Sequence, residues 1–192
     1  RMVPINTEMP KGLLEVNGEP LVERIIRQLH EVGIKEIYVV VGFMKEKYEY
    51  LIDDYGVELV VNTEYAAKNN LHSLKLVKEH LENSYIIPCD IWCDRNPFHR
   101  NELYSWYMVS ALVDNESNVR VNRKMELVTV PEASGGNAMI GICYLIKEDA
   151  DIVERRIEEL CGNQRYDDSF WEEALYHNCL LYTSPSPRDG LL

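Results

Sequence analysis

The chain of 192 residues lacks several features that assign a protein to a class at once. No stretch reaches the roughly 18 consecutive apolar residues of a membrane-spanning helix, so we expect no membrane partner. Basic residues number 20 against 32 acidic ones, and the net charge of −12 argues against nucleic acid, whose phosphates need clustered Lys and Arg. The five cysteines show no disulfide or zinc spacing. We expect a cytoplasmic protein whose partners are small molecules.

Both ends of the chain look unusual. It begins at Arg1, without an initiator Met or a preceding strand, so we expect a cut N-terminus. Residues 179–192 break from the helical pattern before them and resemble a translated sequencing adapter, although a natural Ser/Pro-rich tail is the alternative. We interpret residues 1–178 as one N-terminally truncated domain, long enough for a single core. Residues 179–192 are set aside as non-native.

Apolar periodicity predicts alternating helices and strands as far as residue 90. Residues 19–32 repeat at helical spacing, with Pro20 in the first turn and Gly33 as the stop. A β-branched run at 37–41 is typical of a strand buried on both faces. This order predicts a doubly wound parallel sheet. The remaining elements expected here are a helix over 45–55, a strand over 57–61, a helix over 70–81 capped by Asn70, and a strand over 85–88.

The pattern becomes β-rich after residue 90. Strands are expected over 106–113 and 139–145, and a hairpin over 119–121 and 125–130. Helices are expected over 149–160 and 169–176. The sequence shows no internal repeat and no linker rich in Gly, Pro or Ser, which favours one domain.

The opening segment carries the most specific pattern of the chain. It reads as a loop with one Arg and one Lys, a short strand over 13–16, and an Asn-Gly turn into a helix. Lys11 follows Pro10 and precedes the strand, so its ammonium is held in a restricted place. A cation of this kind suits a compact phosphate group, which Lys binds as a point charge.

Acidic residues near two predicted elements could bind a metal. Asp90 follows the strand over 85–88, and ligands of open α/β sheets bind beyond the carboxyl ends of the strands. On position alone, a Mg²⁺ ligand and a plain turn-forming Asp are equally open. Glu172 and Glu173 lie on an expected amphipathic helix, where solvated acids are the common outcome. The five histidines show no metal spacing, and we assign them to surface or capping roles: His30, His72, His80, His99 and His177.

Taken together, these motifs resemble the sugar-phosphate nucleotidylyltransferase superfamily and, within it, the bacterial CTP:phosphocholine cytidylyltransferases. The resemblance spans Arg1 to about Asn178. It implies an α/β fold with a Rossmann-like, doubly wound, mostly parallel sheet of the nucleotide-diphospho-sugar transferase type. The first strand and the Gly-rich triphosphate loop of the family are missing here, and the β-rich part would bind the acceptor. Three segments carry most of the resemblance: Asn17-Gly-Glu-Pro-Leu21, Val39-Val-Val-Gly42 and Asn69-Asn-Leu-His-Ser-Leu74.

The resemblance also implies roles at a catalytic centre. Lys11 would steady the charge that develops during transfer, and Arg1 would hold the β- and γ-phosphates. Asp90 would be the first ligand of Mg²⁺. Glu172, with Glu173 as the rival, would be the second ligand in a place where the family carries Asp.

Further residues would bind the two substrates. The family's Asn-Asn-x-x-Ser-Leu stretch lines the base and ribose, and helix capping by the same asparagines is compatible with that role. A quaternary ammonium is held by aromatic faces with carboxylates nearby. Most aromatic residues after Asp90 suit a core, and one or two are expected at the ligand. The resemblance assigns nucleotide binding to Asn62, Asn69, Asn70 and Ser73, and we assign acceptor binding to Trp92, Trp171 and Tyr144.

These observations lead to a hypothesis for the intact protein: transfer of a cytidylyl group from CTP to phosphocholine, with release of pyrophosphate. One alternative keeps the chemistry with another acceptor, either a hexose 1-phosphate with UTP or dTTP, or aminoethylphosphonate with CTP. The other alternative is a regulatory domain that binds a nucleotide without catalysis. The oligomeric state is left open.

Overall fold

The computed structural model describes residues 9–114, 119–124, 126–129, 135–176 and 182–185. Contacts between Cα atoms divide the chain into two compact units. Unit 1 comprises Arg1–Ala67, Pro88–Arg100 and Arg188–Leu192, and unit 2 comprises Lys68–Ile87 and Asn101–Pro187. That the chain forms one domain over residues 1–178 stays a prediction.

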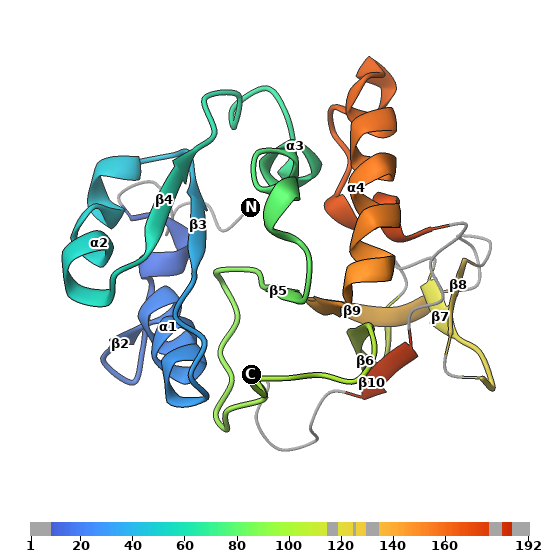
Figure 1. Cartoon of the computed structure of the whole chain (residues 1–192), viewed down its shortest axis with the longest axis horizontal. Helices are drawn as coiled ribbons and strands as arrows, with labels where there is room; N and C mark the ends of the chain where they lie inside the picture. The colour runs from blue at the N-terminus through green and yellow to red at the C-terminus, as the bar shows by residue number, and fades with distance from the viewer. Residues whose placement is uncertain (1–8, 115–118, 125, 130–134, 177–181, 186–192) are drawn as a thin grey trace. The chain divides into compact units, whose positions relative to one another are not determined.

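Unit 1 contains a two-stranded parallel sheet, with β3 beside β4 (Figure 1). The strands pair in register from Tyr38 opposite Glu58 to Val41 opposite Val61. Parallel strands need a crossover connection, and α2 lies on it. The predicted helix over 45–55 is present in two pieces, a 3₁₀ turn and α2. The elements of this unit are η2 (Lys11–Leu13), β1 (Glu15–Val16), β2 (Glu19–Pro20), α1 (Leu21–Glu31), β3 (Tyr38–Val41), η3 (Lys45–Tyr48), α2 (Tyr50–Tyr55) and β4 (Glu58–Val61).

A tight hairpin of β1 and β2 leads into α1. Asn17 and Gly18 join the two strands with φ angles of 55° and 79°. Two consecutive positive φ angles fit a type I′ turn, which Asn-Gly favours. The predicted strand over 13–16 is wrong at its start, because the N–H of Leu13 closes a 3₁₀ turn on the carbonyl of Pro10 at 3.0 Å.

α1 buries its apolar face and ends where the sequence indicated. Val22 and Ile26, one turn apart, belong to a buried cluster of unit 1. Gly33 follows the helix with a φ of 84°, a conformation that costs glycine little. The N–H of Ile34 then reaches back to the carbonyl of Leu29 at 3.0 Å, which satisfies the helix end. The other members of the cluster are Leu13, Val41, Tyr48, Leu51 and Val57.

Unit 2 is built around a four-stranded sheet of order β10-β6-β9-β5. β9 pairs antiparallel with both β5 and β6, and β10 pairs parallel with β6. β7 and β8 form the predicted hairpin. Its elements are α3 (Asn70–Lys75), η4 (Lys78–His80), β5 (Ser84–Ile86), β6 (Trp106–Asp114), β7 (Val119–Val121), β8 (Leu127–Thr129), β9 (Gly136–Leu145), α4 (Lys147–Cys161), η6 (Gln164–Tyr166), η7 (Trp171–Leu175) and β10 (Tyr182–Pro185).

Some boundaries in unit 2 differ from the prediction. The helix expected over 70–81 ends at Lys75, because the N–H groups of Leu76 and Val77 bond three residues back and tighten the chain into 3₁₀ geometry. The segment expected as a helix over 169–176 is the 3₁₀ turn η7. β10 lies within the residues set aside as non-native, and their origin stays a prediction.

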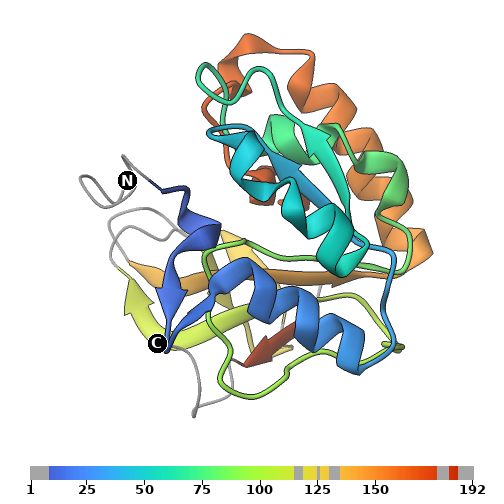
Figure 2. The ribbon, with the colours of Figure 1, turned by 90° about the vertical axis from the view of Figure 1, so that its left-hand side faces the viewer.

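The core of unit 2 joins one face of its sheet to helices. Tyr107 on β6 and Cys143 on β9 are paired neighbours, and both belong to this core. Side chains alternate along a strand, so Trp106 and Tyr144, also paired, face the other way. The orange helix α4 lies beside the green helix α3 (Figure 2). The helical members of the core are Leu71 and Leu74 of α3, Ala150, Val153, Ile157 and Leu160 of α4, and Trp171, Ala174 and Leu175 of η7.

Candidate functional site

Lys11 and Asp90, 79 positions apart in the chain, are in direct contact within unit 1. The Nζ of Lys11 donates a hydrogen bond to Oδ2 of Asp90 at 3.0 Å. The two side chains are 39% and 29% exposed, so the pair is open to a ligand from solvent. A partly exposed ion pair of this kind contributes little to stability. The structure therefore brings together the two residues that the sequence singled out, in an arrangement that leaves them available for phosphate and cation.

Close packing fixes the backbone on both sides of this pair. Gly12 is buried, and a Cβ atom there would lie 3.0 Å from Oη of Tyr48 and 3.2 Å from Cβ of Cys89. Glycine therefore lets the chain after Lys11 lie close to the residue before Asp90 without a tight contact. Burial raises the pKa of Tyr48, so its hydroxyl stays protonated beside this contact.

Asn62 and Gly42 shape the carboxyl ends of β4 and β3. The Oδ1 of Asn62 accepts a hydrogen bond from the N–H of Glu64 at 2.8 Å, which closes a local turn. A Cβ atom at Gly42 would lie 2.5 Å from Cβ of Tyr65. Both residues thus set the backbone at the edge of the sheet where α/β proteins bind ligands. Binding of a nucleotide by Asn62 stays a prediction.

Trp92 follows Asp90 and is almost fully buried. It is 7% exposed, and the Cζ atom of Arg24 lies 4.3 Å from its ring centroid. A cation of the protein itself thus already contacts this ring. Recognition of an acceptor by Trp92 stays a prediction.

In unit 2, Asn69 and Asn70 join α3 to the segment that precedes η7. Nδ2 of Asn69 donates to the carbonyl of Asp168 at 3.0 Å, and its Oδ1 accepts from the N–H of Asn70 at 2.8 Å. The Oδ1 of Asn70 accepts from the N–H of Trp171 at 2.8 Å. Asn69, not Asn70 as predicted, occupies the N-cap position of α3. Ser73 lies one turn further along the same helix.

His72 is buried, so the surface or capping role predicted for it is wrong. It is 5% exposed, and its Nε2 lies 3.1 Å from Oδ1 of Asp167. His72 thus adds a side-chain contact between α3 and the segment that leads to η7.

Glu172 has the most unusual surroundings of the predicted site residues. Its Oε1 accepts a hydrogen bond from the hydroxyl of Tyr107 at 3.0 Å. Its Oε2 is buried and has no hydrogen-bond partner within the part of the chain that the structure describes. Burial raises the pKa of Glu172, although hydrogen bonds from its own backbone and from Tyr107 oppose the shift. A buried carboxylate oxygen without a donor is suited to hold a proton or a cation.

Tyr144 lies in a row of aromatic rings on one face of the unit 2 sheet. Its ring centroid is 4.8 Å from that of Tyr85, which in turn is 5.9 Å from Trp106. The hydroxyl of Tyr85 donates to Oε1 of Glu102 at 2.7 Å. Aromatic rings near a carboxylate are the chemistry that binds a quaternary ammonium, so the place of Tyr144 is compatible with its predicted role. The ring of Trp171 contacts Tyr107 instead, at 6.0 Å between centroids.

The described residues contain no group of three or more His, Cys, Asp or Glu that could hold a metal ion. Mg²⁺ does not need such a group, since it usually takes one or two carboxylates together with water and phosphate oxygens. The half-exposed carboxylate of Asp90 and the unpartnered oxygen of Glu172 each fit this donor chemistry. Arg1 lies outside the described residues. Of the helices that the structure describes, none has the length and apolarity to cross a membrane.

Sequence reasoning missed three residues that shape the site: Gly12, Arg24 and His72. The small residue directly after Lys11 was an available signal for close packing at Gly12. The contacts by which Arg24 and His72 shape the site carry no local signal, because they join residues 69 or more positions apart in the chain.

Comparisons with known proteins give matches over most of the chain. The family of the MobA-like NTP transferase domain matches residues 1–122. A choline-phosphate cytidylyltransferase of Streptococcus pneumoniae is 33% identical over 183 residues, covering 93% of this chain and 79% of that protein. A 2-aminoethylphosphonate cytidylyltransferase of Lancefieldella rimae is 30% identical over 190 residues, covering 91% and 74%.

Solved structures agree with these matches. The structure of a CTP:phosphocholine cytidylyltransferase from Streptococcus pneumoniae superimposes with a TM-score of 0.90 at 29% identity, covering 100% of this chain and 86% of that one. The predicted α/β fold of the nucleotide-diphospho-sugar transferase type is confirmed.

Proposed function

Because the chain belongs to the MobA-like NTP transferase family, we propose that it transfers a cytidylyl group from CTP to phosphocholine. The products are CDP-choline and pyrophosphate. The observation that carries the proposal is the 3.0 Å contact between Lys11 and Asp90. It is found in a chain that is 33% identical, over 93% of its length, to a choline-phosphate cytidylyltransferase.

The reaction needs positioning and charge neutralisation more than acid-base chemistry. A phosphate oxygen of phosphocholine would attack the α-phosphorus of CTP in line, and the bond from that phosphorus to the oxygen of the β-phosphate would break. Negative charge would grow on the transferred phosphate and on the leaving pyrophosphate. Lys11 is the cation for the first of these charges, since its half-exposed ammonium can contact a phosphate. Arg1 is proposed for the β- and γ-phosphates.

Mg²⁺ would be held by Asp90. We keep Glu172 as the proposed second ligand because its Oε2 has no hydrogen-bond partner among the described residues. When bound, the ion supplies positive charge that neutralises the phosphate oxygens. Asp90 also holds the ammonium of Lys11 by a hydrogen bond. Asp90 would thus restrain the position of Lys11 before the substrates arrive.

The substrate-binding roles are part of the same proposal. Asn62 and Ser73 are the proposed contacts to the nucleotide. The observed hydrogen bonds of Asn69 and Asn70 support a role in placing α3, with any contact to the base or ribose additional. For the choline group, the aromatic row that contains Tyr144 gives the best support among the three predicted residues. Trp92 and Trp171 remain in the proposal as further candidates.

A second acceptor is favoured by one observation: the 30% identity to a 2-aminoethylphosphonate cytidylyltransferase. This acceptor carries a primary ammonium where phosphocholine carries a quaternary one. A primary ammonium needs hydrogen-bond acceptors, whereas a quaternary ammonium has no N–H to donate and relies on aromatic faces.

The test measures pyrophosphate and the nucleoside-diphosphate product for CTP, UTP and dTTP with phosphocholine, 2-aminoethylphosphonate and glucose 1-phosphate. It uses the 192-residue chain and a version extended by the Gly-rich segment that the resemblance places before Arg1. CDP-choline as the main product, lost on removal of Mg²⁺ by EDTA, is the expected result. Nucleotide binding without pyrophosphate in either version, with every acceptor, would overturn the proposal in favour of a non-catalytic domain.

Variants of the Lys11–Asp90 pair test the mechanism. Lys11→Ala and Asp90→Asn should each lower kcat about 100-fold or more. The first removes the positive charge that would contact a phosphate, and the second removes the carboxylate that would hold Mg²⁺ and that orients Lys11. Thermal stability should change little, since the pair is partly exposed to solvent. Lys35→Ala, at an exposed lysine of the same unit, is the control and should keep full activity. An unchanged rate in Lys11→Ala would remove this residue from the mechanism.

A further inference from the structure

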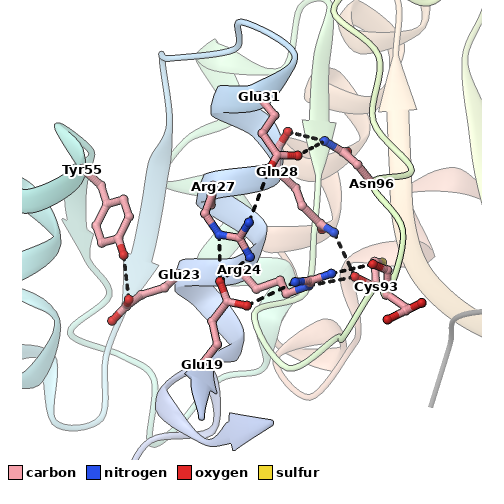
Figure 3. Close-up of polar contacts among 10 residues, drawn as sticks. Glu19, Glu23, Arg24, Arg27, Gln28, Glu31, Tyr55, Cys93 and Asn96 are labelled. Atoms are coloured by element: carbon pink, nitrogen blue, oxygen red, sulfur yellow. Dashed lines mark hydrogen bonds and ion pairs between the residues drawn. The ribbon is translucent and has the colours of Figure 1, made fainter. Parts of the chain in front are cut away.

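Side chains on the polar face of α1 form hydrogen bonds with the segment that follows Asp90 (Figure 3). Nε of Arg24 donates to the carbonyl of Cys93 at 3.0 Å, and Nη2 donates to the carbonyl of Asp94 at 2.5 Å. One turn further along the helix, Nε2 of Gln28 donates to the same carbonyl of Cys93 at 2.8 Å. Two side chains of one helix face thus hold two consecutive backbone carbonyls.

The segment also donates hydrogen bonds back to α1. Nδ2 of Asn96 donates to the carbonyl of Gln28 at 2.7 Å and to Oε2 of Glu31 at 3.1 Å. The guanidinium of Arg24 also lies over the ring of Trp92, with Cζ 4.3 Å from the ring centroid. Residues 92–96 are therefore held to α1 by side chains, by backbone and by a cation–π contact.

Arginine is the residue this arrangement needs. Its planar fork donates to two carbonyls while its flat face covers an aromatic ring, and the compact ammonium of lysine cannot do both from one position. The side chain of Arg24 is only 16% exposed, and Nη1 contacts Oε2 of Glu19 at 3.2 Å. Glu19 thus orients the guanidinium from the side opposite the carbonyls.

We propose that Arg24 is a positioning residue for Asp90: by holding residues 92–94, it fixes the carboxylate of Asp90 beside Lys11. The inference rests on the proposed function, which assigns that carboxylate the role of a Mg²⁺ ligand. Asp90 lies two residues before Trp92, so a shift of the held segment moves its backbone directly. Arg24 itself would touch neither substrate nor metal.

Arg27 provides a matched control on the same helix. Within the described residues its side-chain hydrogen bonds go to Glu19 and Glu31, and its side chain is 47% exposed. Arg24 and Arg27 thus share the partner Glu19, but it is Arg24 that holds the carbonyls after Asp90. Arg24→Lys and Arg27→Lys keep the charge of the helix while each removes one guanidinium.

The first measurement is hydrogen–deuterium exchange of the whole protein, which needs no activity. Arg24→Lys should speed exchange in peptides covering residues 89–96 and leave β3 and β4 as protected as in the wild type. Arg27→Lys should leave residues 89–96 unchanged. Equal protection of residues 89–96 in wild type and Arg24→Lys would overturn the inference. If Arg24→Lys fails to fold, Gln28→Leu serves instead, because it removes the second donor to Cys93.

The second measurement is the Mg²⁺ concentration that gives half the maximal rate. Arg24→Lys should raise it about 10- to 100-fold, as expected when a residue that orients a metal ligand is lost. A purely structural role would lower the amount of folded protein and leave that concentration unchanged. Faster exchange without a shift in Mg²⁺ requirement would therefore overturn the positioning role. If wild-type protein makes no product, the proposed function fails, while the exchange result still decides whether Arg24 holds the segment.

Discussion

The side-chain oxygen of Asn70 accepts a hydrogen bond from the backbone N–H of Trp171 at 2.8 Å, across 101 positions of the chain. Two backbone bonds run parallel to it, from the N–H of Asn69 to the carbonyl of Asp167 at 2.7 Å and from the N–H of Leu71 to that of Ser169 at 3.4 Å. Residues 69–71, at the start of α3, are therefore bound to residues 167–171, which lead into η7. Trp171, the first residue of η7, directly precedes Glu172.

Asn70→Ala should loosen the attachment of Trp171 to the start of α3. The N–H of Trp171 would lose its acceptor, and a lost hydrogen bond of this kind costs about 1 kcal/mol of unfolding free energy. Hydrogen–deuterium exchange should accelerate in residues 169–173. Asn70→Asp keeps an oxygen in place and should restore most of the protection. If Asn70→Ala exchanges as slowly as the wild type, the hydrogen bond does not hold the segment.

The sequence predicted those elements whose cause is local. The Asn-Gly turn, the amphipathic α1 with its stop at Gly33, and the β-branched β3 each follow from residues close together in the chain. A common catalytic centre for Lys11 and Asp90 was also predicted, but from a family resemblance rather than from periodicity. Hydrogen bonds from side chains to distant backbone carbonyls, such as those of Arg24, could not be predicted. Because every residue has a backbone carbonyl, the sequence does not indicate which residue accepts such a bond.

The difference between α-helical and 3₁₀ geometry was equally hidden. The apolar spacing of residues 169–176 fits a helix, and Trp171 and Leu175 are indeed both buried. The structure nevertheless forms the short 3₁₀ turn η7, in a segment fixed by hydrogen bonds to α3. The helix predicted from periodicity is therefore a 3₁₀ turn here, and the hydrogen bonds to α3 that accompany this geometry could not be predicted from local spacing.

Gly12→Ala should disturb the backbone that carries Lys11. The new Cβ would meet Oη of Tyr48 at 3.0 Å and Cβ of Cys89 at 3.2 Å, and neither neighbour can give way without moving the core or the residue before Asp90. Overpacking of this kind costs about 1–3 kcal/mol. Chemical denaturation should show this loss, together with a lower kcat.

Gly162→Ala is the control for Gly12→Ala. Its Cβ would approach the carbonyl oxygen of Glu159 at 3.4 Å, an ordinary contact, and the backbone there is helical. It should be neutral or slightly stabilising, since alanine restricts the unfolded chain. Equal stability of Gly12→Ala and the wild type would show that the packing around Gly12 is looser than described.

The ion pairs of Glu19 should make stability depend on pH in the acidic range. Burial acts to raise the pKa of Glu19, but hydrogen bonds from Arg27 and Arg24 outweigh it and lower the pKa below the ordinary 4.5. The contribution of the ionised carboxylate is therefore complete above about pH 4.5 and is lost as the pH falls through the lower, folded-state pKa. The advantage of wild type over Glu19→Gln should shrink as the pH falls below about 4.5. An advantage that stays constant over this range would contradict the ion-pair account.

Glu172→Gln should show the opposite dependence, because burial raises the pKa of this carboxyl group. Folding favours its protonated form, so the wild type loses stability as the pH rises from the ordinary value of 4.5 through the folded-state pKa. Glutamine is neutral throughout and keeps an oxygen for the hydroxyl of Tyr107. In EDTA, the stability of Glu172→Gln relative to wild type should therefore rise with pH. Glu173→Gln is the control, because it removes one negative charge from the same turn.

Mg²⁺ then separates a metal ligand from a merely buried acid. A cation bound to the ionised carboxylate stabilises the folded wild type by mass action, and it has no such group in Glu172→Gln. Millimolar Mg²⁺ at neutral pH should therefore raise the melting temperature of the wild type more than that of the variant. If Mg²⁺ raises both equally while the pH dependence is as expected, Glu172 is a buried acid but is not the second ligand.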